Sequence, residues 1–150
     1  MITVSSFKEA ERDAKNFDLV ISLMDVDMKS HFQKFHPNQK VWFFDDITNN
    51  AWGTPATEKD IQEIIETFIP FQDKKVLIHC HAGISRSPAT AIGLKIATGM
   101  PIKEAIENTA AQRPIMWAND LIIQLFDDFL NLDGELFFAD EQWKLDQHRA

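Results

Sequence analysis

Residues 75–98 constrain the fold more than any other part of the chain, because an apolar run, a short polar loop and a helix-forming stretch follow one another directly. The run KVLIHC at residues 75–80 has a polar start and a β-branched centre, which is typical of a buried central strand. Residues 88–98 begin with a proline, which the first turn of a helix tolerates, and are followed by Gly99, a typical helix end. This segment therefore predicts a strand, a tight loop and a helix in succession.

Other apolar runs predict the remaining strands of a sheet. They are Ile2–Val4, expected at an edge, Phe17–Met24 and Lys40–Phe44. Between residues 61 and 69, apolar side chains fall at i, i+3, i+4, i+7 and i+8, behind a predicted N-cap at Thr57 with Asp60 three residues on. Three more helices are expected, namely Ile102–Gln112, Asn119–Leu132 and a short final one at Asp140–His148. The alternation indicates an α/β fold with a central, mostly parallel sheet of about four to five strands flanked by helices.

Length and charge narrow the class of protein. The 150 residues fit one domain, expected to span residues 1–150. With 23 acidic and 15 basic residues the formal net charge is −8, which argues against a general nucleic-acid binder and against docking on an anionic membrane. No apolar run approaches the roughly 18–20 residues of a membrane span, and the first residues lack a basic and then apolar leader. We therefore expect a cytoplasmic protein, and a monomer.

Cys80 is the only cysteine, so neither an internal disulfide nor a multi-cysteine zinc site is expected. It ends the predicted central strand, and ligands of open α/β sheets bind at the carboxyl ends of the strands. A lone cysteine at a strand end is otherwise a small buried apolar side chain. The residues that follow Cys80 decide between these two interpretations.

The loop after Cys80 has the composition of an anion site. A short loop between a strand and a helix N-terminus directs backbone N–H groups and the positive end of the helix dipole into one concavity. Gly83 permits the unusual backbone conformation of a curled loop, and Arg86 supplies a planar fork that holds two phosphate oxygens at once. A cysteine in this positive field favours the thiolate, which is its nucleophilic form. The loop therefore indicates a thiolate that attacks the phosphorus of a bound phosphate.

The sequence HCHAGISRS at residues 79–87 resembles the signature loop of the cysteine-dependent protein phosphatases, and most closely that of their dual-specificity branch. The resemblance continues at Arg113 and at residues 118–125, and covers roughly residues 17–132. It implies a cysteine phosphatase-like α/β fold. It also implies a reaction that uses neither a metal ion nor another cofactor.

The resemblance further implies a role for each residue of the loop. Cys80 is the nucleophile, and the Ser87 hydroxyl helps its sulfur to leave in the second step. The phosphate-binding residues are His81, Ala82, Gly83, Ile84, Ser85 and Arg86. His79 is expected to fix the loop from behind, and the ring of His81 to lie at the rim.

The dual-specificity branch also uses a general acid, an aspartate roughly thirty residues before the cysteine. Asp46 and Asp45 lie 34 and 35 residues before Cys80, directly after a predicted strand. We expect Asp46 to be the acid, because in related enzymes with paired aspartates it is generally the second that acts. Asp45 is the alternative, and a third interpretation is that both aspartates only cap a turn.

The expected partner is a phosphorylated protein or peptide that carries phosphotyrosine, with phosphoserine and phosphothreonine left open. Phosphoinositide phosphatases of this superfamily carry lysines inside the loop, and residues 81–85 have none, which disfavours inositol phosphates. Two alternatives stay open: a non-catalytic module that binds phosphorylated ligands, and the same chemistry on a non-protein phosphate ester.

Two predictions concern residues outside the loop. Arg113 either braces the catalytic loop or is an ordinary surface arginine. Trp42, Trp117 and Trp143 are expected in the core, as aromatic side chains at strand and helix positions usually are.

Overall fold

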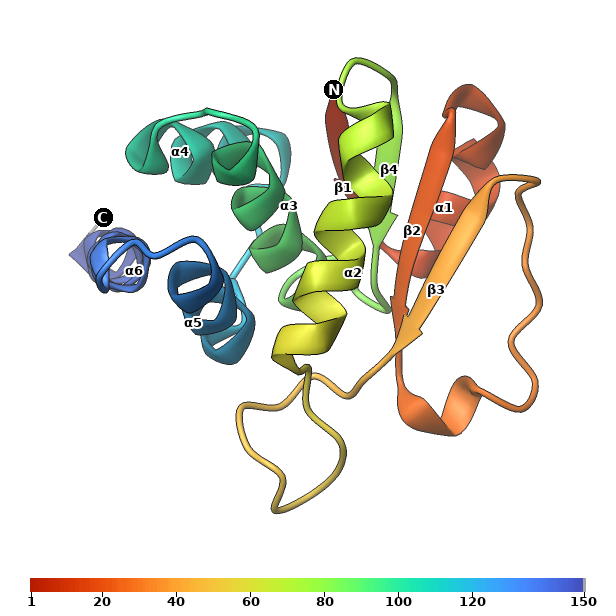
Figure 1. Ribbon diagram of the computed structural model, residues 1–150, viewed down its shortest axis with the longest axis horizontal. Helices are drawn as coiled ribbons and strands as arrows, with labels where there is room; N and C mark the ends of the chain where they lie inside the picture. Colours follow the sequence, from red (N-terminus) through yellow and green to blue (C-terminus); the bar gives the residue numbers. More distant parts are fainter. Residues whose placement is uncertain (150) are drawn as a thin grey trace.

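The computed structural model describes residues 1–149 of the chain. Its sheet has four parallel strands in the order β1-β4-β2-β3 (Figure 1). The strands are β1 (Ile2–Ser5), β2 (Leu19–Met24), β3 (Gln39–Phe43) and β4 (Val76–His79). The predicted α/β fold around a parallel sheet is confirmed, and the first run of the chain does form an edge strand.

Six α-helices and three short 3-10 turns connect and flank the strands. The helices are α1 (Phe7–Asp13), α2 (Glu58–Phe68), α3 (Arg86–Ala97), α4 (Ile102–Gln112), α5 (Asp120–Phe129) and α6 (Glu135–Arg149). The turns are η1 (Ala14–Asn16), η2 (Val26–Met28) and η3 (Ile69–Phe71). Sequence reasoning missed α1 and began α6 five residues too late, whereas the other four helices lie where the pattern predicted them. Within residues 1–149, none of these helices has the length and apolar character that crossing a membrane requires.

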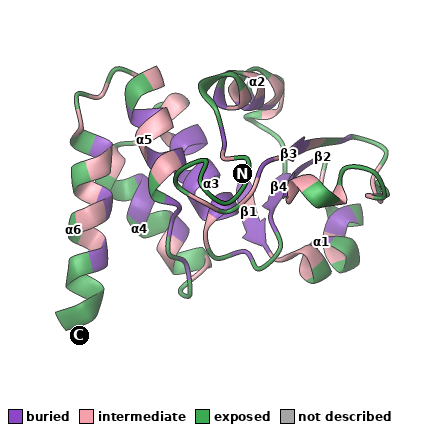
Figure 2. Ribbon diagram, turned by 90° about the horizontal axis from the view of Figure 1, so that it is seen from below, coloured by how far each residue is buried: buried purple, intermediate pink, exposed green. Residues whose placement is uncertain are grey.

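Helices cover both faces of the sheet, and each face has its own apolar core (Figures 1 and 2). Helix α1 lies on one face, where Ala10 and Ala14 are buried with Val20 and Leu77 of the two central strands. Helices α2 and α3 lie on the other face, and α4, α5 and α6 pack outside α3. Burial on both faces explains why the central strands are apolar throughout.

Strand β4 lies between β1 and β2, and successive side chains of the strand point to opposite faces. Cys80, which follows β4 directly, is buried in the main core together with Val76 and Ile78. His79 points the other way, against Phe7 of α1. The loops that follow β2, β3 and β4 meet at the carboxyl edge of the sheet, at the bottom of Figure 1.

Helix α6 is fixed to the rest of the domain by a buried lysine. Lys144 donates from Nζ to the backbone oxygen of Ala118 at 2.7 Å and to Asp120 Oδ1 at 2.6 Å, and it pairs with the fully buried Asp140 at 2.9 Å. Burial lowers the pKa of Lys144, but the hydrogen bonds to Asp120 and Asp140 outweigh it and leave this pKa raised. Lys144 thus lies among three carboxylates, those of Asp120, Asp140 and Glu141. The sequence did not predict that these four side chains, the Lys144 cluster, would come together.

The prediction for the tryptophans was right for Trp42, which is buried, and wrong for Trp117, which is 41% exposed. Trp143 is partly buried against the main core. The ring of Trp117 lies on the surface beside that of Trp143, with centroids 6.3 Å apart. A short loop between α4 and α5 carries Trp117, and its ring packs at the surface on Trp143 and His148 of α6 instead of entering the core.

Candidate active site

The cysteine loop, residues 80–86, joins β4 to α3 at the carboxyl edge of the sheet. The Cys80 thiol lies at its base and is only 2% exposed. The backbone N–H of Gly83 donates to Cys80 Sγ at 3.3 Å, and the Ser87 hydroxyl lies 3.2 Å from the same sulfur. Both groups can donate to a negatively charged sulfur, so the loop suits a thiolate.

Gly83 gives the loop its curl. Its φ is +72°, in the left-handed region that favours glycine, and a Cβ there would lie 2.7 Å from the backbone of Ser5 and from Arg113 Nη2. The backbone N–H groups of Ile84, Ser85 and Arg86 donate to no acceptor among residues 1–149. The loop therefore has three consecutive backbone donors that are not committed to the protein.

The N-terminus of α3 lacks a side-chain cap. Ser85 occupies the N-cap position, but its hydroxyl donates to Asp46 Oδ1 at 2.7 Å and accepts no N–H of the first turn. The N–H groups of this turn and the positive end of the helix dipole therefore remain available to an anion. An anion bound by the loop would complete the hydrogen bonding of this helix end.

Arg86 is buried and only half satisfied. Its Nη1 donates to Asp25 Oδ1 at 2.7 Å and to the backbone oxygen of Phe44 at 2.9 Å. Its Nε is buried and has no hydrogen-bond partner in residues 1–149. One side of the guanidinium is thus anchored, and the edge formed by Nε and Nη2 is left open for an acceptor pair such as two phosphate oxygens.

The two aspartates after β3 have different surroundings. Asp45 accepts hydrogen bonds from the backbone N–H groups of Thr54 at 2.9 Å and Val26 at 3.1 Å, and these bonds lower its pKa. Both carboxylate oxygens of Asp45 are therefore committed to backbone N–H groups. Asp46 is exposed and receives two hydrogen bonds on Oδ1, from Ser85 at 2.7 Å and from Asn119 at 2.9 Å. Asp46 Oδ2 has no hydrogen-bond partner among the described residues.

Arg113 braces the cysteine loop, so the first of its two interpretations is confirmed and that of an ordinary surface arginine is wrong. It donates from Nε to the Gly83 oxygen and from Nη2 to the Ala82 oxygen, both at 2.9 Å. Its Nη1 pairs with Glu9 of α1 at 2.8 Å. Hydrogen bonds from the backbone and hydroxyl of Ser6, ahead of Arg113, lower the pKa of Glu9. The back of the loop is therefore tied both to α1 and to the end of α4.

His79 supports the loop from the α1 side of the sheet, as predicted. Its Nε2 lies 2.6 Å from Ser22 Oγ and its Nδ1 3.1 Å from the Cys80 oxygen, while Gln39 donates to Ser22 at 2.8 Å. A neutral ring with the proton on Nδ1 satisfies all three groups. Burial, ahead of the charge of Arg86, lowers the pKa of His79 to about 4, so the ring is uncharged at neutral pH.

The structure brings together the residues expected in the site. Cys80, Ser87 and Arg86 share the loop and the first turn of α3, and Asp46 contacts this turn through Ser85. The remaining phosphate-binding candidates line the same loop: His81, Ala82, Gly83 and Ile84. Two residues were missed, the Arg86 partner Asp25 and the Asp46 partner Asn119. Each lies directly after a strand or before a helix, but sequence alone does not tell which side chain it meets.

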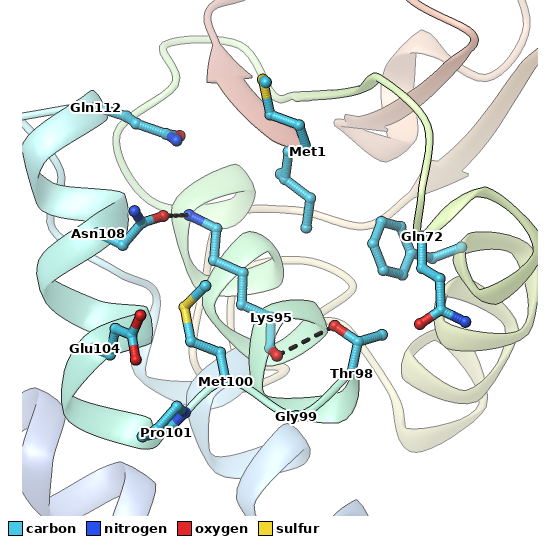
Figure 3. A pocket seen from close by; sticks show the side chains of 12 residues that line it. Met1, Gln72, Lys95, Thr98, Gly99, Met100, Pro101, Glu104, Asn108 and Gln112 are labelled. Atoms are coloured by element: carbon cyan, nitrogen blue, oxygen red, sulfur yellow. Dashed lines mark hydrogen bonds between the residues drawn. The ribbon is translucent and has the colours of Figure 1, made fainter.

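A cavity lies at the opposite end of the sheet, next to the start of β1 and the end of α3 (Figure 3). Its volume is about 570 Å³. Lys95 of α3 is buried beside it and donates to Asn108 and Thr109 of α4, both at 2.8 Å, with no carboxylate within ion-pair distance in the described part of the chain. Burial lowers the pKa of Lys95 to about 8. This cavity shares no lining residue with the cysteine loop.

The fold and the loop together define an α/β domain whose central strand leads directly into a buried cysteine at the base of an arginine-containing loop. The model of the dual specificity phosphatase catalytic domain matches residues 2–128, so the chain belongs to the dual specificity phosphatase family. The match begins at β1, earlier than the resemblance at residue 17 suggested. No match to a curated protein sequence was found.

Solved structures with the same fold are distant in sequence. PTPMT1 in complex with PI(5)P is 19% identical, with a TM-score of 0.66, and the match covers 86% of this chain and 89% of that chain. The human tyrosine phosphatase-like serine/threonine/tyrosine-interacting protein is 18% identical, with a TM-score of 0.63 and coverage of 85% and 86%. DUSP15 is 18% identical, with a TM-score of 0.60 and coverage of 94% and 90%. At this identity the likeness shows the fold alone.

Proposed function

We propose that this chain hydrolyses phosphomonoesters of proteins, with phosphotyrosine as the main substrate, through a phosphocysteine intermediate. The observation that carries the proposal is the open edge of Arg86. A buried guanidinium without an acceptor on Nε is costly unless a ligand completes it. A planar pair of donors fits two oxygens of an oxyanion, and the uncommitted loop N–H groups beside it favour phosphate, which has further oxygens to bind. Cys80 Sγ lies at the base of the same loop, where it would face the phosphorus of that oxyanion.

In the first step the Cys80 thiolate attacks phosphorus opposite the ester oxygen. The S–P bond forms as the P–O bond to the leaving group breaks, and the loop N–H groups and Arg86 hold the three remaining oxygens. A carboxylic acid at Asp46 gives its proton to the leaving oxygen. This proton transfer contributes about 10²–10⁴-fold in rate, because a tyrosyl oxygen leaves poorly as an anion.

In the second step the Asp46 carboxylate takes a proton from water as the water oxygen attacks phosphorus. The P–O bond forms as the S–P bond breaks, so inorganic phosphate and the thiolate are released together. The Ser87 hydroxyl, 3.2 Å from Sγ, stabilises the departing sulfur. Asp46 thereby returns to the protonated state that the next turnover needs.

Asp46 is favoured over Asp45 as the acid by their hydrogen bonds. The acid has to hold a proton before the reaction, and the pKa of Asp45 is lowered by two backbone N–H groups that favour its charged form. Asp46 keeps Oδ2 unoccupied, and Ser85 and Asn119 fix its orientation through Oδ1. Asn119 is therefore proposed as a residue that positions the acid.

The same fold in PTPMT1 binds PI(5)P, so a lipid phosphate is the competing substrate. Two features argue for a protein substrate in this chain. The loop interior carries no lysine to bind further phosphates, and Arg113, which contacts the loop, has its donors committed to Glu9 and to the loop itself. The site therefore offers no further cation for the phosphodiester that an inositol lipid such as PI(5)P carries besides its phosphomonoester, whereas phosphotyrosine needs none.

The decisive experiment measures hydrolysis of p-nitrophenyl phosphate and of a phosphotyrosine peptide in the presence of EDTA. We expect turnover by the wild type and none by Cys80→Ser, and rapid acid quenching of the wild type should trap phosphate on Cys80. Binding of the peptide without any turnover would instead identify a non-catalytic module. Activity that survives in Cys80→Ser would refute the proposed mechanism.

A further inference from the structure

A small cavity adjoins the cysteine loop on the side of α1. Its volume is about 310 Å³, and its lining residues are Phe7, Met24, Asp25, Asp27, Met28 and His81. The apolar members come from the start of α1, the end of β2 and the turn η2, and His81 belongs to the loop itself. The cavity thus combines an apolar wall with two carboxylates at the mouth of the proposed active site.

The position of the cavity relative to the phosphate is fixed by Asp25. One oxygen of Asp25 lies 2.7 Å from Arg86 Nη1, the side of the guanidinium opposite the open edge. His81 follows Cys80 directly in the chain. The cavity is therefore linked to Arg86 through Asp25 and to Cys80 through the neighbouring residue His81.

The charge of the cavity is negative. Arg86 offsets part of the charge of Asp25, whose side chain is still 47% exposed, whereas Asp27 is exposed and forms no ion pair within residues 1–149. Lys29, the nearest cation in sequence, lines a different surface hollow together with Lys40. A cation in the cavity would meet two carboxylates, and an anion would meet repulsion.

We propose that this cavity binds the side chain of a lysine or arginine next to the phosphorylated residue of a peptide. We call it the basic-residue pocket after the side chain that it would bind, and it is lined by Phe7, Met24, Asp25, Asp27, Met28 and His81. The stem of a long basic side chain packs on apolar groups while its charged head stays at the rim, and the pocket offers that arrangement. The inference rests on the proposed phosphatase function and specifies its substrate. A polyphosphorylated inositol ring, by contrast, would bring negative charge to Asp25 and Asp27.

The test compares pairs of phosphotyrosine peptides. Within a pair, the residue next to the phosphotyrosine is either lysine or norleucine, which lacks the amino group of lysine. One pair varies the residue before the phosphotyrosine, and the other pair varies the residue after it. On one of the two sides we expect lysine to raise kcat/KM about fivefold over norleucine at low ionic strength. The effect is modest because the ion pair between the peptide lysine and Asp27 would be partly exposed to solvent. The preference should shrink as salt is raised to about 0.5 M, since screening weakens such pairs.

Asp27 is the residue to change, because Asp25 also anchors Arg86. Asp27→Asn should reduce the preference for lysine to about twofold, and Asp27→Lys should abolish or reverse it. Asp73→Asn, the same charge change just before β4 at the opposite end of the sheet, should retain the fivefold preference.

The outcomes separate this inference from the proposed function. Turnover of both peptides at equal kcat/KM on either side, or a preference that survives in Asp27→Lys, would overturn the basic-residue pocket and leave the phosphatase function standing. Faster turnover of PI(5)P in lipid vesicles than of the lysine peptide would also overturn it. Failure to hydrolyse any of these esters would overturn the proposed function itself.

Discussion

The chain buries two cations beside carboxylates, and it treats them in opposite ways. Lys144 makes hydrogen bonds or ion pairs with Asp120, Asp140 and a backbone oxygen, so all its donors are used. Arg86 has one carboxylate partner, Asp25, and keeps its Nε without an acceptor. The first cation joins α6 to α5, whereas the second lies at the edge of the sheet where strands end.

This difference indicates that Lys144 has a structural role and that Arg86 has a role in binding a ligand. A buried charge that is fully paired stabilises one arrangement of the chain, and removal of the charge leaves its partners unpaired. A buried charge with an open edge contributes less to stability and retains donors for a ligand. Mutations at the two sites should therefore affect different properties, one activity and the other stability.

The largest effect is expected at Arg86. Arg86→Lys keeps the charge but removes the planar fork, so kcat/KM for p-nitrophenyl phosphate should fall about 10³-fold. Stability in urea should change by less than about 1 kcal/mol, because the partner Asp25 is half exposed. Arg12→Lys, at an exposed arginine, is the matched control and should change neither property. A large loss of stability at Arg86 would remove the distinction between the two cations.

The next effect is expected at Lys144, and in stability. Lys144→Met leaves Asp140 buried without its cation, so the free energy of unfolding should fall by about 3 kcal/mol in urea titrations. The double variant Lys144→Met with Asp140→Leu should recover part of this loss. Lys103→Met, at an exposed lysine, should cost under about 0.5 kcal/mol. If Lys144→Met lowered kcat/KM while the protein stayed folded, α6 would have a role in the site.

Asp46 and Asp45 offer a sharper contrast inside the active site. Asp46→Asn should slow hydrolysis of phenyl phosphate about 10²-fold and that of p-nitrophenyl phosphate less, because a good leaving group needs little proton transfer. Asp45→Asn should lower stability through the N–H groups of Thr54 and Val26, with a smaller effect on rate. The reverse pattern would transfer the acid role to Asp45.

His79 predicts a loss of stability in mild acid. Its pKa in the folded state is about 4 against an ordinary 6.5, so the unfolded chain binds more protons between these values. The neutral ring makes its full contribution to the free energy of unfolding above pH 6.5. Between pH 7 and pH 5 this free energy should fall by about 2 kcal/mol, because protonation favours the unfolded chain. His79→Gln should flatten this part of the stability profile relative to the wild type, whereas His31→Gln, at an exposed histidine, should retain it.

The smallest effect is expected at Lys95, a third buried cation whose partners are neutral. Its pKa is lowered from 10.5 to about 8, so the unfolded state binds more protons in this window and stability rises with pH. The contribution of Lys95 should increase by about 1 kcal/mol between pH 8 and pH 9, and Lys95→Met should lack this increase. An unchanged profile in the variant would mean that the lysine is not the group that titrates.

Local patterns predicted the elements, because their causes are local. Apolar β-branched runs became strands, and Thr57 with Asp60 forms the capping box expected at the start of α2. Helix α1 begins with the same signal, a capping box of Ser6 and Glu9. Its seven residues carry too short an apolar face to give a helical period.

The contacts that complete the site could not be predicted in this way. Asp25 and Arg86 are 61 residues apart, and Asp46 and Asn119 are 73 residues apart. Asp25 and Arg86 meet because the parallel strands β2 and β4 bring their carboxyl ends to one edge. Asn119 reaches Asp46 from the N-terminus of α5, which packs against α3 and is held there by the bond from the Asn119 N–H to the Ser85 oxygen. The motif at residues 79–87 predicted the loop itself, since one strand, one loop and one helix form it.

The central position of β4 also has a consequence for how the protein folds. Strand β4 pairs with β1 on one side and β2 on the other, and Ile2 aligns with Val76. Every inter-strand bond that involves β4 therefore closes a long loop of chain, which slows folding relative to a protein of local contacts. During synthesis at about 5–20 residues per second, β1 would wait roughly 4–15 s for its partner strand to emerge. The strand that delivers the cysteine is thus the one that completes the sheet.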